Sequence, residues 1–201
     1  MEFEGMTFRG PEIDDFELLG LLPPVLQEYL RQTNGLVVFD GGFHVRGVCR
    51  EPAWHSLSTV WTGSHALHRW YPEVQPNDIP FAADCVGDQF LLRNGIVHRL
   101  YAEDGRTKDL GLDLPGFLAS AAQDPVGFLM LQPLLQLRAN GHSLKPGQAI
   151  HVYPPLCTKE AAQGVSMKPV SALDCLAYHA RLAEQLSKLR IGEKARFTVK
   201  R

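Results

Sequence analysis

Short hydrophobic runs separated by glycine-bearing turns dominate the middle of the chain. Residues 79–83 form an apolar run, Gly87-Asp88 can turn the chain, and residues 90–92 lead into the dipeptide Asn94-Gly95. Because asparagine and glycine tolerate the positive φ angles of a tight type I′ turn, the run before them is predicted to pair antiparallel with residues 96–101. The hydrophobic pattern therefore predicts a β-hairpin here.

A second hairpin is predicted upstream. Residues 36–39 and 43–48 are strand-like, and Asp40-Gly41-Gly42 between them is a good tight-turn sequence. Further along, Glu103-Asp104-Gly105 predicts another turn. The segment 51–74 is rich in tryptophan and histidine, and we interpret it as a helix or loop that covers one edge of the sheet.

Apolar residues at helical spacing, with capping residues at their ends, predict the helices. Ser171 and Asp174 form a capping box ahead of the clearest of them. Pro133 must split or kink another, since proline removes a helical hydrogen bond. The expected helices are a short one over 14–19, one that starts at Pro23-Pro24 and ends at Asn34-Gly35, one over 114–122 capped by Asp113, one from Asp124-Pro125 towards Ala139, and one after Ser171.

This order of elements predicts an α+β fold with an antiparallel meander and helices packed mainly on one face of the sheet. We place a first domain over 1–123. A second unit over 124–201 is expected to be mainly helical, to pack on the first, and to hold one or two short strands, at 148–153 and 196–200.

Two blocks of the chain form a recognisable pattern. One is IPFA (residues 79–82) followed by an acidic residue and Gly-Asp; the other is LLPPVLQEYLRQTNG (residues 21–35). Together they resemble the SUKH superfamily, which includes yeast cell-wall-synthesis regulators and bacterial toxin-immunity proteins. The resemblance covers roughly residues 14–122 and implies a protein-binding module. The matching residues are interpreted as fold-defining, and they are Leu22, Pro23, Asn34, Gly35, Ile79, Pro80, Gly87 and Asp88.

A further stretch, LKPGQAIHVYPPL (residues 144–156), together with the last helix is similar to a C-terminal domain of some type VI secretion immunity proteins. The chain departs from that pattern after the strand, where Cys157-Thr158-Lys159 replaces the expected pair of glycines. Both resemblances imply a bacterial immunity protein whose partner is a cognate toxin, such as a nuclease or another secreted effector.

Composition narrows the function classes. The chain has 201 residues, 45% of them hydrophobic and 21% charged, with a net charge of −2, so it provides no general positive field for nucleic acid. The acidic N-terminus does not read as a signal peptide, and no apolar run is long enough to span a membrane. The four cysteines form no C-x-x-C pair, which suits reduced thiols in the cytoplasm, and Cys85 and Cys175 lie in apolar patterns typical of core residues.

Catalytic and metal-binding patterns are weak. His65 and His68 stand three apart and could share a helix face as metal ligands, with His55 or His44 completing the site, but no acidic or cysteine ligand has supporting spacing. No nucleophile elbow, P-loop or dinucleotide fingerprint occurs. We therefore predict no cofactor, no metal and no enzymatic activity, with a small hydrolase using a hidden serine or cysteine as an alternative, for example Cys49 or Cys85 with His98.

The candidate partner-binding residues are carboxylates in or beside the predicted turns and tryptophans of the irregular segment. The carboxylates could form an acidic face that occludes a basic partner, or they could simply close turns. The tryptophans could anchor an interface or cover the sheet. Scattered arginines, Arg46 and Arg99 among them, indicate no phosphate site. The candidates are Asp78, Asp84, Asp88, Glu103, Asp104, Asp109, Trp54, Trp61 and Trp70.

The predicted function is thus tight binding of a toxin without turnover, by steric and electrostatic occlusion of its active site. The alternative within the same superfamily is a regulatory or scaffold protein that binds a cellular partner. A second leucine row on the last helix, at Leu182, Leu186 and Leu189, fits either a dimer or the core of a monomer.

Overall fold

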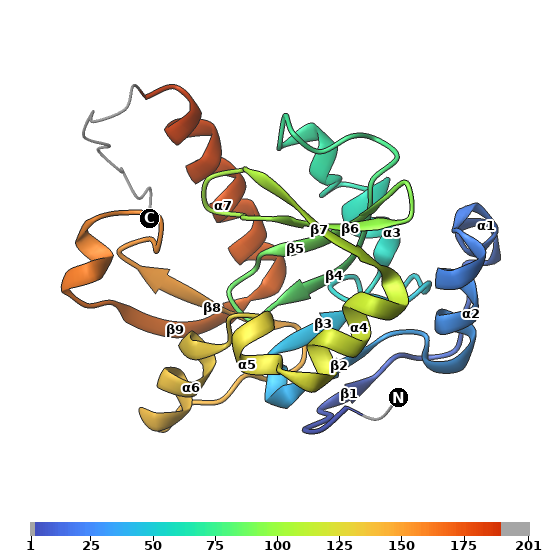
Figure 1. The fold of residues 1–201 in the computed structure, drawn as a ribbon, viewed down its shortest axis with the longest axis horizontal. Coiled ribbons are helices and arrows are strands. Elements are labelled where there is room, and N and C mark those ends of the chain that lie inside the picture. Colours follow the sequence, from blue (N-terminus) through green and yellow to red (C-terminus); the bar gives the residue numbers. More distant parts are fainter. Residues whose placement is uncertain (1–2, 190–201) are drawn as a thin grey trace.

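One antiparallel sheet of seven strands forms the centre of the protein (Figure 1). We analysed a computed structural model, which describes residues 3–189. The strands follow one another in chain order across the sheet, so the sheet is a meander, as predicted. They are β1 (Phe8–Arg9), β2 (Leu36–Val38), β3 (Phe43–Val45), β4 (Ile79–Asp84), β5 (Gln89–Arg93), β6 (Ile96–Leu100) and β7 (Thr107–Asp113).

Both predicted hairpins are present. Leu91 pairs with His98 in the β5–β6 ladder, and the connecting Asn94 and Gly95 have φ angles of 51° and 83°. These are the left-handed values that a two-residue type I′ turn requires. In the β2–β3 hairpin, Val38 pairs with Phe43.

Most helices begin and end where the capping residues indicate. The short helix expected over 14–19 runs instead over Phe16–Leu21, because the Asp15 side chain caps it by accepting from the N–H of Leu18. The Asp113 side chain accepts a hydrogen bond from the N–H of Gly116, and Asn34 ends its helix in the left-handed conformation. The segment that holds Pro133 is split, as predicted. The α-helices are α1 (Phe16–Leu21), α2 (Pro24–Thr33), α3 (Leu57–Trp61), α4 (Leu114–Gln123), α5 (Pro125–Phe128), α6 (Gln132–Ala139) and α7 (Ala172–Ser187).

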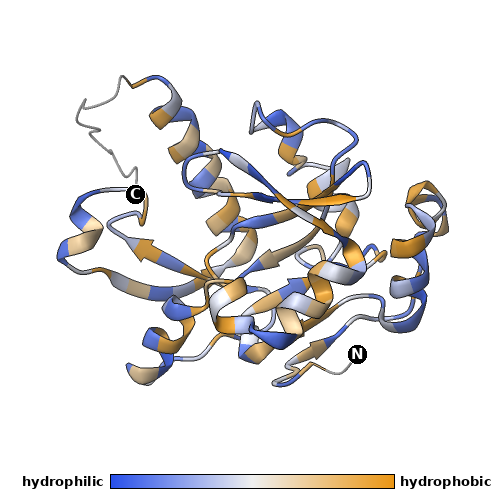
Figure 2. Cartoon of the chain, viewed as in Figure 1, coloured by the Kyte–Doolittle hydropathy of each residue, from blue (hydrophilic) through white to orange (hydrophobic). Residues whose placement is uncertain are grey.

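The larger hydrophobic core lies on one face of the sheet. Phe43, Phe90 and Phe117 pack there with ring centroids 4.8–5.9 Å apart, and helices α1, α2, α4 and α6 contribute buried leucines to the same core. Figure 2 shows hydrophobic residues along α4 and a mixture of both kinds along α7. The predicted α+β class, with most helices on one face, is confirmed.

The opposite face carries a smaller core built around Leu91 and Leu100. Helix α7 supplies Leu176 and Ala180, and the loop before β4 supplies the fully buried Tyr71. The tryptophan-rich segment was expected to cover an edge of the sheet, but it covers part of this face instead. Its apolar residues are buried against the strand residues that point away from the larger core.

The C-terminal part packs against the meander. Ile150 belongs to the larger core and its N–H donates to the carbonyl of Cys85 at 2.7 Å. A hairpin of β8 (Gln148–Tyr153) and β9 (Ser166–Ser171) precedes α7. The pattern predicted β8 but not β9, which contains Pro169 and is polar at several positions. The other expected strand, over 196–200, lies outside the described residues.

Helix α7 shows the Ser171 half of the predicted capping box, in which the Ser171 side chain accepts a hydrogen bond from the N–H of Asp174. Within residues 3–189, no helix combines the length and hydrophobicity needed to cross a bilayer.

Candidate functional site

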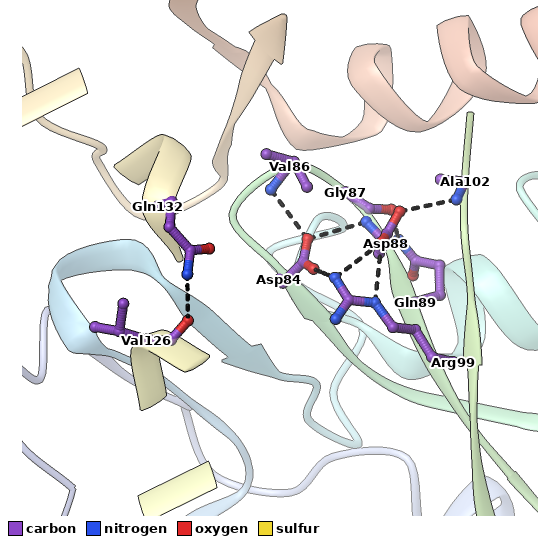
Figure 3. Close-up of polar contacts among 9 residues, drawn as sticks. All are labelled: Asp84, Val86, Gly87, Asp88, Gln89, Arg99, Ala102, Val126 and Gln132. Atoms are coloured by element: carbon purple, nitrogen blue, oxygen red, sulfur yellow. Dashed lines mark hydrogen bonds and ion pairs between the residues drawn. The ribbon is translucent and has the colours of Figure 1, made fainter. Parts of the chain in front are cut away.

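Two aspartates and one arginine meet where β4 turns into β5 (Figure 3). Asp84 ends β4, and its Oδ1 accepts hydrogen bonds from the N–H groups of Val86 and Asp88 at 3.0 and 3.1 Å. Gly87 takes the positive φ angle of 93° that this tight turn requires. The turn therefore brings the side chains of Asp84 and Asp88 to one place.

Arg99 on β6 binds both carboxylates, and we call these three residues the Arg99 network. Its Nη2 donates to Oδ2 of Asp84 at 2.6 Å and its Nε donates to Oδ2 of Asp88 at 3.0 Å. The guanidinium also lies 5.5 Å from the ring centroid of Phe90 and 5.3 Å from that of Tyr101. Only 5% of the Arg99 side chain is exposed, and none of that of Asp84.

The network places two carboxylates beside a single guanidinium in a buried environment. Burial is the largest cause that raises the pKa of Asp84, and the neighbouring Asp88 raises it further, although Arg99 opposes both. Burial also raises the pKa of Asp88. The pKa of Arg99 is raised despite burial, because both carboxylates stabilise its charge. Three titratable groups thus share one desolvated site, in which two carboxyl groups adjoin a single guanidinium.

A recess of about 460 Å³ opens beside this network. Asp88 and Arg99 line it together with Glu103, Asp104 and Arg106 from the β6–β7 turn, and residues from two distant segments complete it. We call this site the acidic recess. Its remaining lining residues are Val86, Tyr101, Met130, Gln132, Pro133, Leu156 and Cys157.

The rim of the acidic recess is fixed by hydrogen bonds between segments. Glu103 accepts from the N–H groups of Leu156 and Cys157 at 3.0 and 2.7 Å, which ties the loop after β8 to the sheet. The Gln132 side chain donates to the carbonyl of Val126 at 3.4 Å (Figure 3). These bonds hold the loop after β8 on the sheet and the start of α6 on α5 at the edge of the recess.

Charged and apolar side chains both line the recess. Three carboxylates, those of Asp88, Glu103 and Asp104, line it with the two guanidinium groups of Arg99 and Arg106, and the fully buried Asp84 pairs with Arg99 behind this lining. Met130 and Leu156 remain 49% and 44% exposed at the rim. Met130 also has a φ angle of 60°, a left-handed value that costs free energy for a residue with a side chain.

The structure brings four of the six carboxylates singled out in the sequence to this site: Asp84, Asp88, Glu103 and Asp104. Asp78 lies elsewhere, where it is buried and paired with Arg93 at 2.6 Å. Asp109 is exposed on β7 and caps the N–H of Gly111.

The three tryptophans do not join the recess. Trp54 packs on Phe8 and His44, with ring centroids 4.8 and 5.2 Å apart. Trp61 lies against the larger core and Trp70 against the smaller one, both partly buried. In the described chain they cover the sheet.

Of the four histidines considered as metal ligands, His44 and His55 lie beside each other, and His65 makes separate contacts. Nε2 of His44 lies 2.9 Å from Nδ1 of His55, whose Nε2 lies 2.9 Å from the carbonyl of Asn34. His65 instead contacts Ser64 and Trp70. Residues 3–189 contain no group of three His, Cys, Asp or Glu side chains placed to hold a metal ion.

The cysteines expected to be core residues, Cys85 and Cys175, are both buried. Cys175 lies 3.9 Å from Nε2 of His179, a pair that the sequence pattern did not suggest. Burial raises the pKa of this thiol to about 12 and lowers the pKa of His179 to about 4. Both groups are neutral near pH 7, whereas an activated nucleophile needs a thiolate. Burial also raises the pKa of Cys49 and of Cys85.

Sequence reasoning missed Arg99, Met130 and Leu156 as site residues. Arg99 had a usable signal, because it shares the inward face of β6 with Val97, and a charged residue at a core-facing strand position needs a buried partner. Met130 and Leu156 carry no such signal, since they reach the recess only through the tertiary fold.

No family model and no curated protein matches the chain. Among solved structures, the crystal structure of Atu4351 from Agrobacterium tumefaciens is similar, with a TM-score of 0.53 over 88% of this chain and 85% of that chain. The two sequences are 14% identical over the match. At this identity the likeness shows a shared fold and no more, so membership of the SUKH superfamily stays a prediction.

Proposed function

We propose that this protein is a non-catalytic protein-binding module that holds a basic side chain of its partner in the acidic recess. The observation that carries the proposal is the combination of a recess of about 460 Å³ with surplus carboxylates and an exposed apolar rim. A lysine or arginine side chain has the matching chemistry, because its stem is apolar and its head is cationic.

The rim suits a protein partner. Methionine is flexible and polarisable, and it is frequent on surfaces that adapt to a partner. Met130 and Leu156 together offer apolar area that a partner would remove from water. The lining has three carboxylates against two guanidinium groups, and this surplus of one carboxylate would raise the association rate of a basic surface and disfavour an acidic one.

The class of partner that we propose comes from the resemblance to immunity proteins. On that basis we propose a cognate toxin whose basic active-site groove is occluded by this face. Occlusion requires a preorganised surface and no turnover, and the hydrogen bonds from Leu156 and Cys157 to Glu103 provide such preorganisation.

Affinity capture from cells that express the protein natively tests the proposal with matched baits. The wild-type bait is compared with Leu156→Arg, which adds a positive charge at the rim, and with Leu135→Arg, which adds the same charge at a leucine that is 49% exposed on α6 and outside the recess. We expect a stoichiometric partner with wild type and Leu135→Arg that is lost with Leu156→Arg. Equal recovery by all three baits would contradict the recess as the binding site. A toxin encoded beside this protein supports immunity, and a housekeeping partner supports the regulatory alternative.

A further inference from the structure

Helix α7 passes close to the acidic recess. Burial raises the pKa of Tyr178 on α7, and the nearby carboxylate of Glu103 raises it further. Five residues along the helix, Ala183 lies against the β6–β7 turn, because a Cβ atom added to Gly105 would be 3.5 Å from the Cβ atom of Ala183. This turn supplies three residues of the recess lining: Glu103, Asp104 and Arg106. The second half of α7 therefore lies beside the recess.

The chain leaves α7 within reach of the recess. The helical hydrogen bonding continues to the N–H of Leu189, which donates to the carbonyl of Leu186 at 3.0 Å. From Ala183 to Leu189 a helix rises by about 9 Å. Residues 190–193 can span at most about 14 Å when extended. The residues from Lys194 onward can therefore return to the β6–β7 turn.

Residues 190–201, which we call the basic segment, differ in charge from the rest of the chain. They hold five basic residues and one acidic residue, whereas the chain as a whole has 20 basic and 22 acidic residues, which leaves 15 and 21 for the rest. Phe197 and Val199 alternate with polar residues, so an extended conformation would place them on the side opposite Arg196. The basic segment thus combines cationic and apolar side chains.

We propose that the basic segment occupies the acidic recess of its own chain, with Lys194 or Arg196 at the carboxylates and Phe197 against Met130 and Leu156. Three observations favour this occupant. The segment begins beside the recess, its charge is opposite to the surplus charge of the lining, and the two apolar residues that it would cover are 49% and 44% exposed. A short tether also gives an effective concentration on the order of millimolar, so a weak contact suffices.

This contact makes the basic segment a competitor of the partner that we propose for the recess. Only that competition rests on the proposed function, because the contact within the chain needs no partner. If the basic segment fills the recess in nine chains out of ten, the apparent affinity of the partner falls about tenfold, since only the open fraction is able to bind. The partner must then displace the basic segment in order to bind.

Paramagnetic relaxation in the full chain tests the contact in the absence of any partner. A nitroxide is attached at Thr198→Cys in a Cys157→Ser background, where the other three cysteines are buried. Methionine methyl groups labelled with carbon-13 report the distance. Met130 lies in the recess, and Met6 is 53% exposed and outside it. We expect the Met130 signal to be lost while that of Met6 is kept, and an intact Met130 signal would overturn the proposal.

Charge reversal separates a specific contact from simple proximity. Lys194→Glu combined with Arg196→Glu should restore the Met130 signal. The matched control, Arg31→Glu combined with Lys168→Glu, reverses two exposed charges outside the recess and should leave the signal lost. If the charge-reversed segment broadens Met130 as strongly as the original one, the carboxylates do not hold the segment and the proposal is wrong.

Two further arms complete the test. Nitroxide-labelled chains are mixed with carbon-13-labelled chains, and loss of Met130 in that mixture would assign the segment to a second copy and overturn the contact within one chain. In calorimetry, the captured partner should bind the Lys194→Glu, Arg196→Glu chain more tightly than wild type. Equal affinities would overturn the competition, whereas a partner indifferent to Leu156→Arg would overturn the proposed function and leave the contact within the chain standing.

Discussion

Replacement of Arg99 by leucine would remove the guanidinium that Asp84 and Asp88 share. The side chain of Arg99 is 5% exposed and makes charged hydrogen bonds of 2.6 and 3.0 Å to the two carboxylates. Loss of one partner from a buried ion pair costs about 3–5 kcal/mol, because the remaining charge stays buried and uncompensated. We therefore expect Arg99→Leu to lower the free energy of unfolding by about that amount.

The loss should grow with pH. Without Arg99, burial and mutual repulsion raise the pKa of both carboxyls further, so the folded state keeps them protonated while the unfolded state ionises them above about pH 4. A raised folded-state pKa gives stability that is present at low pH and is lost as the pH rises. Arg99→Leu should therefore lose more stability at pH 8 than at pH 5, and adding Asp84→Asn should restore part of the loss.

Urea unfolding monitored by tryptophan fluorescence at pH 5 and pH 8 measures these differences. Arg106→Leu is the matched control, since Arg106 is 74% exposed in its pair with Asp104 and such surface pairs contribute about 0–1 kcal/mol. If Arg99→Leu costs no more than Arg106→Leu, or costs the same at both pH values, the reasoning about the Arg99 network is wrong.

Three further predictions concern the fold and its buried groups. Gly95 has a φ angle of 83° in an exposed turn, so Gly95→Ala should lower the free energy of unfolding by about 1–2 kcal/mol in the same urea assay, and no change would refute the type I′ turn. His179 has a pKa lowered to about 4 by burial, so the protein should lose stability as the pH falls from about 6.5 towards 4; this slope should be shallower in His179→Gln, and an unchanged slope would contradict the buried neutral imidazole. Burial and then the Glu103 carboxylate raise the pKa of Cys157 to about 12, so a thiol reagent at pH 7.5 should modify it at least about 100-fold more slowly than free cysteine, whereas one fast cysteine would favour the hydrolase alternative.

The parts of the fold that could be predicted are those specified by residues close together in the sequence. The Asn94-Gly95 turn and the Ser171 N-cap act within a few residues, and both are found where the sequence placed them. Strand β9 escaped prediction because Pro169 and its polar neighbours lack an alternating pattern, and only pairing with β8 makes this segment a strand.

The candidate site was predictable only in part, for a related reason. Acidic residues in turns could be recognised from composition, and Asp84, Asp88, Glu103 and Asp104 do meet. Nothing local indicates that Leu156 closes the same recess, because it approaches Glu103 from 53 residues away. Sites assembled from distant loops leave no periodic signal in one sequence.

Calorimetric titration of the captured partner against wild type, Leu156→Arg and Leu135→Arg is the most direct test of the proposed binding face. The account predicts one-to-one binding at nanomolar strength for wild type and Leu135→Arg, and binding at least about tenfold weaker, or about 1.4 kcal/mol, for Leu156→Arg. Equal affinity for all three proteins, with Leu156→Arg folded, would contradict the claim that the acidic recess is the binding site.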